Sequence, residues 1–291
     1  MPADDIRLSP EAGLELLPRR GPGARELGLP VPPARMPLIR DGRPLKRWRY
    51  VGAYGPELML CAGDVRIGPL RQRFWAVVAP GEPLLERTAL LGSGGLRIDG
   101  GRVSIDASGV RARLAIAGDG EGVETISRHG GSYIWTRKQA GVAVDGLVEL
   151  HGRPIRVHCE GVVDDTAGYH ARHTAWTWSA GVGHAADGRR IGWNLVAGVH
   201  DDPRASERTI WFDGRPREVG PVTFAPDLSA IRFAEGGELR FAEWAAREDE
   251  TNALLLRSSY RQPFGSFEGA LPGGVRLERG WGVMETHDVW W

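Results

Sequence analysis

Acidic, phenolic and imidazole side chains gather in the segment that begins at Asp164. Asp164 and Asp165 are followed by Tyr169, His170 and His173, and such a set could supply a general acid and the group that orients it. Adjacent residues of a strand point to opposite faces, so only one of the two carboxylates can serve a given cavity. We take Asp165, Tyr169 and His173 as candidate catalytic residues. A turn in which an Asp side chain caps the backbone explains the pair equally well.

A second acid and imidazole lie in the last strand pattern, WGVMETHDVWW. Alternation places Trp281, Val283, Glu285 and His287 on one strand face, with Glu285 and His287 roughly 7 Å apart. This spacing suits a carboxylate that orients an imidazole or shares a water with it. Glu285 is therefore a candidate catalytic residue and His287 a candidate ligand contact. The alternative is a salt-bridged final strand whose tryptophans pack as a plug.

A tryptophan-rich hairpin is predicted between residues 168 and 198. Its first strand alternates Arg172, Thr174, Trp176 and Trp178 on one face, and an Asp-Gly turn separates it from a second strand. Such a hairpin either anchors a core or lines a ligand cavity. The candidate ligand contacts are Arg172, Trp176, Trp178, Trp193 and Asn194, with Tyr260 added from the bend in SSYRQPFGSF.

The elements that must position these residues are short strands. From residue 46 almost to the end, strand patterns alternate with Gly, Asp and Pro turns about every ten residues, which is typical of sandwiches and barrels. We predict an all-β, antiparallel fold: two barrel-like halves or a large two-part β-sandwich. The expected division is an irregular Pro- and Arg-rich arm (1–45), a first half (46–165) and a second half (166–291). Residues 241–252 are the one stretch that could form a short helix.

Composition narrows the function classes. The chain has 37 basic and 37 acidic side chains among 291 residues, and this balance argues against a nucleic-acid or anionic-membrane surface. No stretch approaches the roughly 20 apolar residues of a membrane span, and the N-terminus lacks a signal-peptide pattern, so we expect a cytoplasmic protein. The two cysteines are expected to be free thiols. No metal-ligand spacing or cofactor motif is present.

Six segments carry a family resemblance: KRWRYVGAYGPELMLC, GPLRQRFWAV, AGYHARHTAWTWSAGVG, IGWNLVAG, SSYRQPFGSFEG and GVMETHDVWW. They resemble the bacterial domain-of-unknown-function 2804 family over residues 45–291, and this family supplies no activity. The tryptophan strands and the closing strand are also similar to lipocalin-like relatives of carotenoid hydratases. That similarity implies two calycin-type barrels, large apolar ligands such as isoprenoids, and hydration or cyclisation of double bonds. The hydratases' His-Gln-Trp-Gly segment is absent here.

Three functions remain open from the residues and the resemblance. The first is an enzyme in which Asp165 or Glu285 protonates an alkene or polarises a carbonyl of an apolar ligand, while Trp176, Trp178 and Trp193 shield a cation. The second is a carrier whose polar groups only orient the ligand. The third is a scaffold whose tryptophans fill two cores. A cavity-facing carboxylate with no arginine partner favours the enzyme. The sequence leaves the oligomeric state open.

Overall fold

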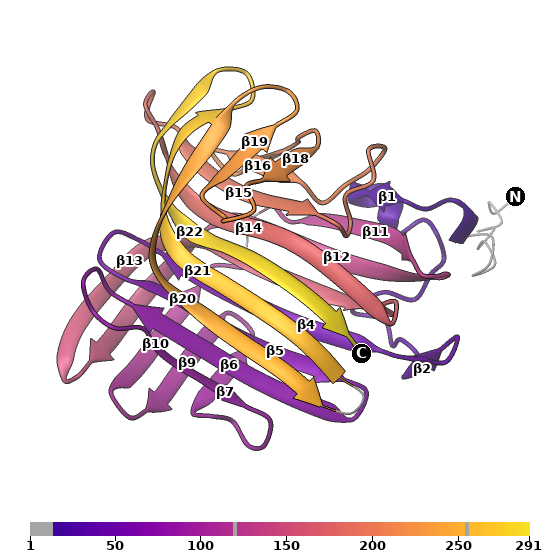
Figure 1. Cartoon of the computed structure of the whole chain (residues 1–291), viewed down its shortest axis with the longest axis horizontal. Coiled ribbons are helices and arrows are strands. Elements are labelled where there is room, and N and C mark those ends of the chain that lie inside the picture. Colours follow the sequence, from indigo (N-terminus) through magenta and orange to yellow (C-terminus); the bar gives the residue numbers. More distant parts are fainter. Residues whose placement is uncertain (1–13, 119–120, 254–255) are drawn as a thin grey trace, which may run out of the picture.

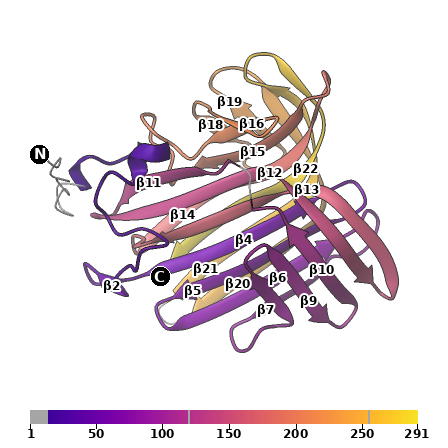
Figure 2. The same ribbon diagram turned by 180° about the vertical axis from the view of Figure 1, so that it is seen from behind.

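A computed structural model describes residues 14–118, 121–253 and 256–291. Its strands form two large antiparallel sheets (Figures 1 and 2). The first sheet contains β1 (Arg19–Arg20), β4 (Lys46–Tyr54), β5 (Met59–Ile67), β6 (Leu70–Val78), β7 (Leu85–Ala89), β8 (Leu96–Asp99), β9 (Arg102–Ala107), β10 (Val110–Ile116), β11 (Val123–His129), β12 (Ser132–Leu150) and β13 (Arg153–Gly168).

The second sheet contains β14 (His173–Ala185), β15 (Arg190–Ala197), β16 (Thr209–Phe212), β17 (Arg215–Glu218), β18 (Val222–Phe224), β19 (Ala230–Phe233), β20 (Glu238–Ala253), β21 (Leu256–Leu271) and β22 (Val275–Trp290). The small strands β2 (Ile39–Arg40) and β3 (Arg43–Pro44) pair with each other, and η1 (Gly21–Ala24) is a 3-10 helix. The predicted all-β, antiparallel fold class is confirmed, and its two curled half-barrel sheets are consistent with two lipocalin-like barrels.

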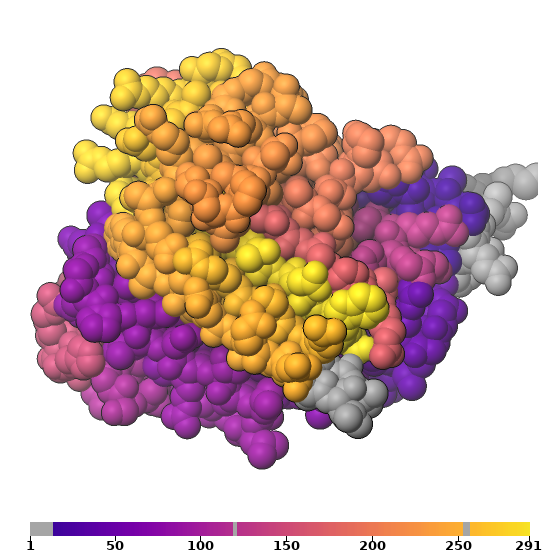
Figure 3. Space-filling view, in the orientation of Figure 1, coloured from indigo at the N-terminus to yellow at the C-terminus, as the bar shows by residue number. Residues whose placement is uncertain are grey.

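The long strands of the second sheet extend across the first sheet. In the cartoon, β20, β21 and β22 continue from their curled end over β4, β5 and β6 (Figure 1). Their orange and yellow atoms cover part of the first sheet on this face (Figure 3). The order β17-β16-β15-β14-β22-β21-β20-β19-β18 places β14 and β22 at the centre of the second sheet.

Alternation of apolar and polar residues builds the cores. In β10, the residues that alternate with arginine or alanine are buried: Val110, Ala112, Leu114 and Ile116. They belong to a first core inside the curl of the first sheet, and a second core lies inside the curl of the second sheet. An inter-sheet core joins residues such as Tyr50 and Met59 of the first sheet to Trp178 and Phe264 of the second.

A β-bulge in β12 lets one strand serve two cores. The pairing with β13 shifts between Ala140 and Val142, and Gly141 adopts a positive φ of 75° there. An extra residue at a bulge reverses which face the following side chains occupy. Before the bulge, Thr136 and Lys138 face the space between the sheets, whereas Val142 packs in the first core.

The prediction of a short helix at residues 241–252 is wrong, because this segment lies within β20. It pairs with β21 along its length, and Phe241 packs on Phe267 with ring centroids 4.7 Å apart. These partners outweigh the helix propensity of Ala and Glu, which is only a weak preference. Within the described residues, no helix has the length and apolar character needed to cross a membrane.

The described part of the N-terminal arm packs on the first sheet. β1 pairs with β11, and the buried side chains Leu17, Leu27 and Met36 join a core of their own with Tyr133 and Tyr169. The arm also contacts the second sheet: the Arg20 guanidinium donates to the Ser206 carbonyl and to Thr209 Oγ1 at 2.5 and 2.8 Å.

Candidate functional site

A cavity of about 350 Å³ lies between the two sheets. Side chains of β4, β5, β6, β12 and β13 line it from the first sheet, and side chains of β14, β15, β20, β21 and β22 line it from the second. Its volume lies at the lower end of the roughly 300–1,000 Å³ range of small-molecule sites. The interior is therefore hollow where the two sheets face each other.

Strand register explains which side chains reach the cavity. Trp176 and Trp178 are two residues apart in β14 and pair across the ladder with His287 and Glu285 of β22. All four line the cavity, because residues that are directly opposite each other in a ladder share a sheet face. On the first sheet, Trp48 and Tyr50 of β4 line the cavity by the same alternation.

Glu285 is held by three neutral donors. Trp176 Nε1 donates to Glu285 Oε1 at 2.7 Å, while the Tyr260 hydroxyl and Gln262 Nε2 donate to Oε2 at 3.0 and 2.9 Å. Gln262 is itself fully buried, and its Oε1 accepts a contact of 3.6 Å from the Cys61 thiol. That contact is consistent with an amide orientation in which the NH₂ group faces Glu285.

Burial shifts the protonation equilibrium of Glu285 toward the neutral carboxyl. Burial raises the pKa of this carboxyl above its ordinary value of 4.5, although the hydrogen bonds from Trp176 and Tyr260 oppose the rise. Among the residues that the structure describes, no Arg or Lys nitrogen lies within 4.0 Å of the Glu285 oxygens. Glu285 is thus a cavity-facing acid without a cationic partner.

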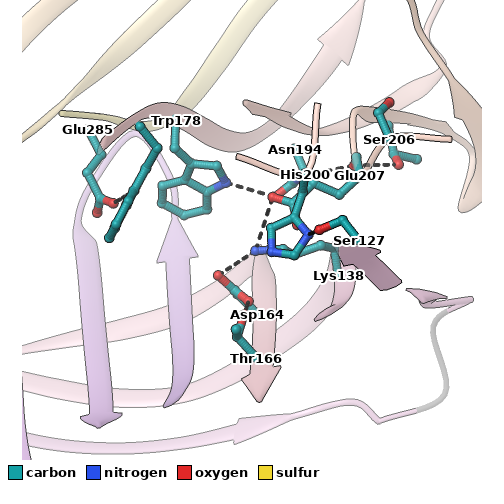
Figure 4. Close-up of polar contacts among 12 residues, drawn as sticks. Ser127, Lys138, Asp164, Thr166, Trp178, Asn194, His200, Ser206, Glu207 and Glu285 are labelled. Carbon is teal, nitrogen blue, oxygen red and sulfur yellow. Dashed lines mark hydrogen bonds and ion pairs between the residues drawn. The ribbon is translucent and has the colours of Figure 1, made fainter. Parts of the chain in front are cut away.

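A second polar cluster lies on the other side of Trp178 (Figure 4). Lys138 Nζ lies 2.7 Å from Asp164 Oδ2 and 3.4 Å from Glu207 Oε1, and all three side chains are buried. Burial opposes the charge on Lys138, but the two carboxylates outweigh it and raise its pKa. The Thr166 hydroxyl donates to Asp164 Oδ1 at 3.1 Å.

Trp178 links the two halves of the site. Its Nε1 donates to Asn194 Oδ1 at 2.8 Å, and the Asn194 amide donates in turn to the backbone carbonyl of Glu207 at 3.0 Å. The Tyr50 ring meets the Trp178 indole edge-on, with centroids 5.6 Å apart. The indole is only 6% exposed, so it is both a core side chain and part of the cavity wall.

Five buried polar atoms of residues that line the cavity have no hydrogen-bond partner within the described parts of the chain. They are Arg49 Nε, Thr136 Oγ1, His170 Nδ1, Glu207 Oε2 and Arg247 Nη1. Buried polar groups in native proteins are nearly always paired, with protein or with another molecule. These residues of the wall therefore offer hydrogen bonds to a ligand or to water.

Five of the candidate site residues line this cavity: Glu285, His287, Tyr260, Trp176 and Trp178. His287 Nε2 lies 2.9 Å from the Ser258 hydroxyl, and burial lowers the pKa of the imidazole to about 4. Its ring packs edge-on against those of Trp176 and Tyr260 at 4.5 and 5.2 Å. Neutral imidazole thus closes the aromatic wall beside the carboxyl.

Three other candidates lie elsewhere. Asp165 lines a separate surface groove and lies 3.7 Å from Arg49 Nη1; burial raises its pKa, which Arg49 opposes. The Tyr169 hydroxyl donates to the Pro37 carbonyl beneath the arm at 2.8 Å. His173 is exposed, bonded to Asp288 Oδ1 at 2.9 Å and stacked on Trp290.

The hairpin candidates divide between wall, core and surface. Arg172 is exposed and precedes β14, so it does not share the cavity face of Trp176. Trp193 is fully buried in the second core, where its Nε1 donates to Ser179 Oγ at 3.0 Å. Asn194 supports Trp178 from behind rather than lining the cavity.

Sequence reasoning did not identify several cavity residues. Lys138, Glu207 and Gln262 were not considered, and Asp164 and His170 were noted in the acid and imidazole segment but not selected. All of these residues except Gln262 line the cavity, and Gln262 contacts Glu285. One signal was available: Lys138 is one of only two lysines in a chain rich in arginine. No group of His, Cys, Asp and Glu among the described side chains is placed to hold a metal ion.

Comparisons with known proteins agree with this architecture. A family model described as a domain of unknown function, DUF2804, matches residues 110–291. A protein described as AttH, from Nitrosomonas europaea, has a similar fold with a TM-score of 0.54 and 16% identity, covering 88% of this chain and 97% of its own. Kievitone hydratase from Nectria haematococca gives a TM-score of 0.56 and 10% identity over 82% and 88% of the two chains. No curated protein matches the sequence.

Proposed function

The chain belongs to the DUF2804 family, and from that premise we propose that it binds an apolar small molecule between its two sheets and converts it by acid catalysis from Glu285. The reaction class is hydration, isomerisation or cyclisation of a double bond. The ligand class is isoprenoid-like or lipid-like, with a polar group at one end.

One observation carries the proposal: Glu285 is a carboxyl that faces an aromatic cavity and has no cationic partner among the described residues. A carboxyl whose pKa is raised by burial remains protonated closer to neutral pH, as a general acid requires. An ion-paired carboxylate would lack that proton. The arrangement around Glu285 is therefore suited to proton donation.

The surrounding residues have complementary roles in such a reaction. Proton transfer from Glu285 to an alkene carbon leaves a carbocation on the ligand and a carboxylate on the protein. The indole faces of Trp176 and Trp178 stabilise the cation, and Trp176, Tyr260 and Gln262 donate hydrogen bonds to the new carboxylate. Addition of water to the cation and return of a proton to Glu285 complete a hydration, whereas loss of a neighbouring proton gives an isomer.

The wall also supplies groups for the polar end of a ligand. Thr136, His170 and Glu207 each present an unpaired polar atom, and a ligand hydroxyl or carbonyl would satisfy one of them. The name of kievitone hydratase, a protein of similar fold, is consistent with hydration chemistry on this scaffold. Because proteins of one fold catalyse different reactions, the proposal depends on the residues around Glu285 and not on the shared fold.

The proposal is tested with farnesol as a probe in heavy water. We expect binding to quench tryptophan fluorescence and the recovered probe, or its hydrated or isomerised product, to carry deuterium on carbon. Glu285→Gln should lower the rate of deuterium incorporation by about 10²–10⁴-fold while farnesol still quenches. Glu268→Gln, which changes an exposed glutamate on neighbouring β21, is the matched control and should retain the rate.

Three outcomes would contradict the proposal. If farnesol and the compounds that native mass spectrometry finds with the purified protein bind without deuterium incorporation, the protein is a carrier. If Glu285→Gln incorporates deuterium at the wild-type rate, the acid is a different group. A protein that binds no apolar compound would contradict both the enzyme and the carrier.

A further inference from the structure

The second lysine of the chain, Lys46, lies beyond the end of the cavity on the same face of β4 as Trp48 and Tyr50. Alternation along the strand places the three side chains on one side, and Trp48 and Tyr50 line the cavity. Lys46 is only 2% exposed. Its Nζ lies 3.3 Å from the ring centroid of Trp291, which itself lines the cavity. The amine is therefore separated from the cavity by one indole.

The groups around Lys46 do not stabilise a positive charge by ion pairing. Within the described residues, no carboxylate oxygen lies within 4.0 Å of Lys46 Nζ. Lys46 interacts electrostatically with three titratable groups, all of them basic: Arg43, His129 and His170. Burial, and then the charge of Arg43, lower the pKa of Lys46 to about 6. The stacked indole contact partly offsets this loss of solvation.

The two lysines contrast sharply. Lys138 lies within 4 Å of two carboxylates and is held as an ammonium ion, whereas Lys46 has an aromatic neighbour and basic groups. A lysine that is desolvated in an apolar pocket or placed beside another cation is the type that acts as an amine nucleophile. Lys46 meets both conditions.

We propose that Lys46 is a carbonyl-reactive amine that forms an imine with an aldehyde or ketone ligand at this end of the cavity. The proposal goes beyond the acid chemistry of Glu285 and does not depend on it. It assigns to the cavity a second reactive group and a second ligand class.

The chemistry is balanced without an added oxidant or reductant. The unprotonated amine of Lys46 attacks the carbonyl carbon, a C–N bond forms, and a proton moves from nitrogen to oxygen to give a carbinolamine. Loss of one water then gives the C=N bond. His170, whose buried Nδ1 has no partner in the described chain and faces the same end of the cavity, is placed to relay a proton in these steps. The ligand reaches the amine once the Trp291 indole turns aside.

Within the described residues, the Trp291 indole makes one side-chain hydrogen bond, 3.3 Å from its Nε1 to Thr174 Oγ1, beside its ring contacts with Lys46, His170 and His287. A hydrogen bond of this length is weak. The Trp291 side chain can therefore rotate away from Lys46 without any movement of the strands. Trp291→Ala should therefore speed the reaction of Lys46 without changing that of Lys138.

The test uses the full chain with decanal and cyanoborohydride at pH 7, followed by digestion and mass spectrometry. Cyanoborohydride delivers hydride to the imine carbon and makes the bond permanent. We expect alkylation of Lys46 at least about 100 times faster than of Lys138, since an amine with a pKa near 6 is mostly unprotonated and one above 10 is almost wholly protonated at pH 7. The rate at Lys46 should rise with a midpoint near pH 6.

Several outcomes separate the possibilities. In urea the two lysines should react at similar rates, which confirms that the reagents reach both. Glu285→Gln should leave the labelling of Lys46 unchanged, so failure of the acid chemistry and failure of this proposal are distinguishable. Labelling of Lys46 that is no faster than that of Lys138 overturns the proposal. The proposal is also overturned if decanoate binds in the cavity while decanal and cyanoborohydride give no alkylated Lys46. That result would identify a site for an anion instead.

Discussion

Glu285 combines a raised pKa with a fixed position. Its oxygens accept hydrogen bonds from three side chains on two strands, β14 and β21. A carboxyl that only stabilised the fold would gain more from a cationic partner. The neutral donors instead fix its orientation while burial keeps its pKa raised. The proton affinity of this group is therefore a measurable signature of the site.

The raised pKa of Glu285 predicts a pH-dependent contribution to stability. Over the interval between its ordinary value of 4.5 and its raised value in the folded protein, the folded chain retains a proton that the unfolded chain has released. The free energy of unfolding contributed by this group therefore falls as pH rises through that interval. Glu285→Gln removes the effect, so its stability relative to wild type should increase as the pH rises above 4.5.

Urea unfolding at a series of pH values measures this difference, and only its slope is used because the substitution adds a constant offset. A difference between Glu285→Gln and wild type that is constant, or that falls with pH, would mean that the carboxyl is already ionised in the folded state.

Trp178 and Trp176 are predicted to differ in their contribution to stability. Trp178 is almost fully buried, so Trp178→Ala should cost about 3–5 kcal/mol of unfolding free energy. Trp176 is half-buried at the cavity wall, so Trp176→Ala should cost less. Trp178→Phe keeps most of the ring but leaves Asn194 Oδ1 without its donor, which predicts a loss of about 1–3 kcal/mol. Equal losses for the two alanine variants in urea titrations would contradict the assigned burial.

At the scale of single residues, the sequence predicted best where alternation decides the outcome. Period two correctly grouped Trp176 with Trp178 and Glu285 with His287. It also required that only one of Asp164 and Asp165 reach a given cavity, but it could not select Asp164, because that choice depends on which face of β13 meets the second sheet. Arg172 was misplaced because it lies just before β14 begins.

The long strands of the second sheet depend on glycine pairs where they pass from one layer to the other. Gly181 of β14 pairs with Gly282 of β22. A Cβ on Gly282 would lie 2.3 Å from the Ala180 carbonyl oxygen, and one on Gly181 would lie 2.2 Å from the Trp193 ring. Backbone atoms cannot move aside as a flexible side chain can, so the strands approach closely only because these positions lack a side chain.

Gly282→Ala is therefore predicted to destabilise the protein by about 1–3 kcal/mol or more through overpacking. Thermal or urea unfolding followed by circular dichroism measures the loss. Gly118→Ala is the matched control, because a Cβ there meets nothing within 4 Å, and its effect should be within about 0.5 kcal/mol. A Gly282→Ala protein as stable as the control would show that the strands separate freely at this point.

At the scale of elements, hairpins were easier to predict than distant pairings. The Asp187-Gly188 turn and the strands on either side follow from local signals. The pairing of β4 with β13 and of β14 with β22 joins segments about 100 residues apart, and no local pattern encodes such a choice. The strand β20 was mistaken for a helix because its composition favours one, whereas its partners and not its composition determine its conformation.

The whole molecule is two curled sheets that share one interior. The predicted division at residues 45 and 165 remains a prediction about folding units. The cavity, however, takes its wall from both sheets, and the inter-sheet core contains side chains of both. Groups that titrate in this shared interior should affect the unfolding of the two sheets together.

Three histidines that line the cavity provide such a test. They are His170, His200 and His287, and burial lowers the pKa of each, to about 3 for His200 and about 4 for His287. In the unfolded chain each takes up a proton near its ordinary value of 6.5. The stability that they contribute is therefore fully present above pH 6.5 and is lost as pH falls toward 4, by about 1.4 kcal/mol per pH unit for each histidine.

We expect the free energy of unfolding to fall steeply between pH 6.5 and 5, with one transition in which near- and far-ultraviolet circular dichroism coincide. His200→Asn should reduce the slope by about one proton, because His200 is buried and its imidazole bonds the Ser127 hydroxyl. A slope that His200→Asn leaves unchanged would contradict the role of burial. Two separate acid transitions would mean that the sheets unfold independently, and the shared cavity would then be a contact between two autonomous halves rather than part of one cooperative core.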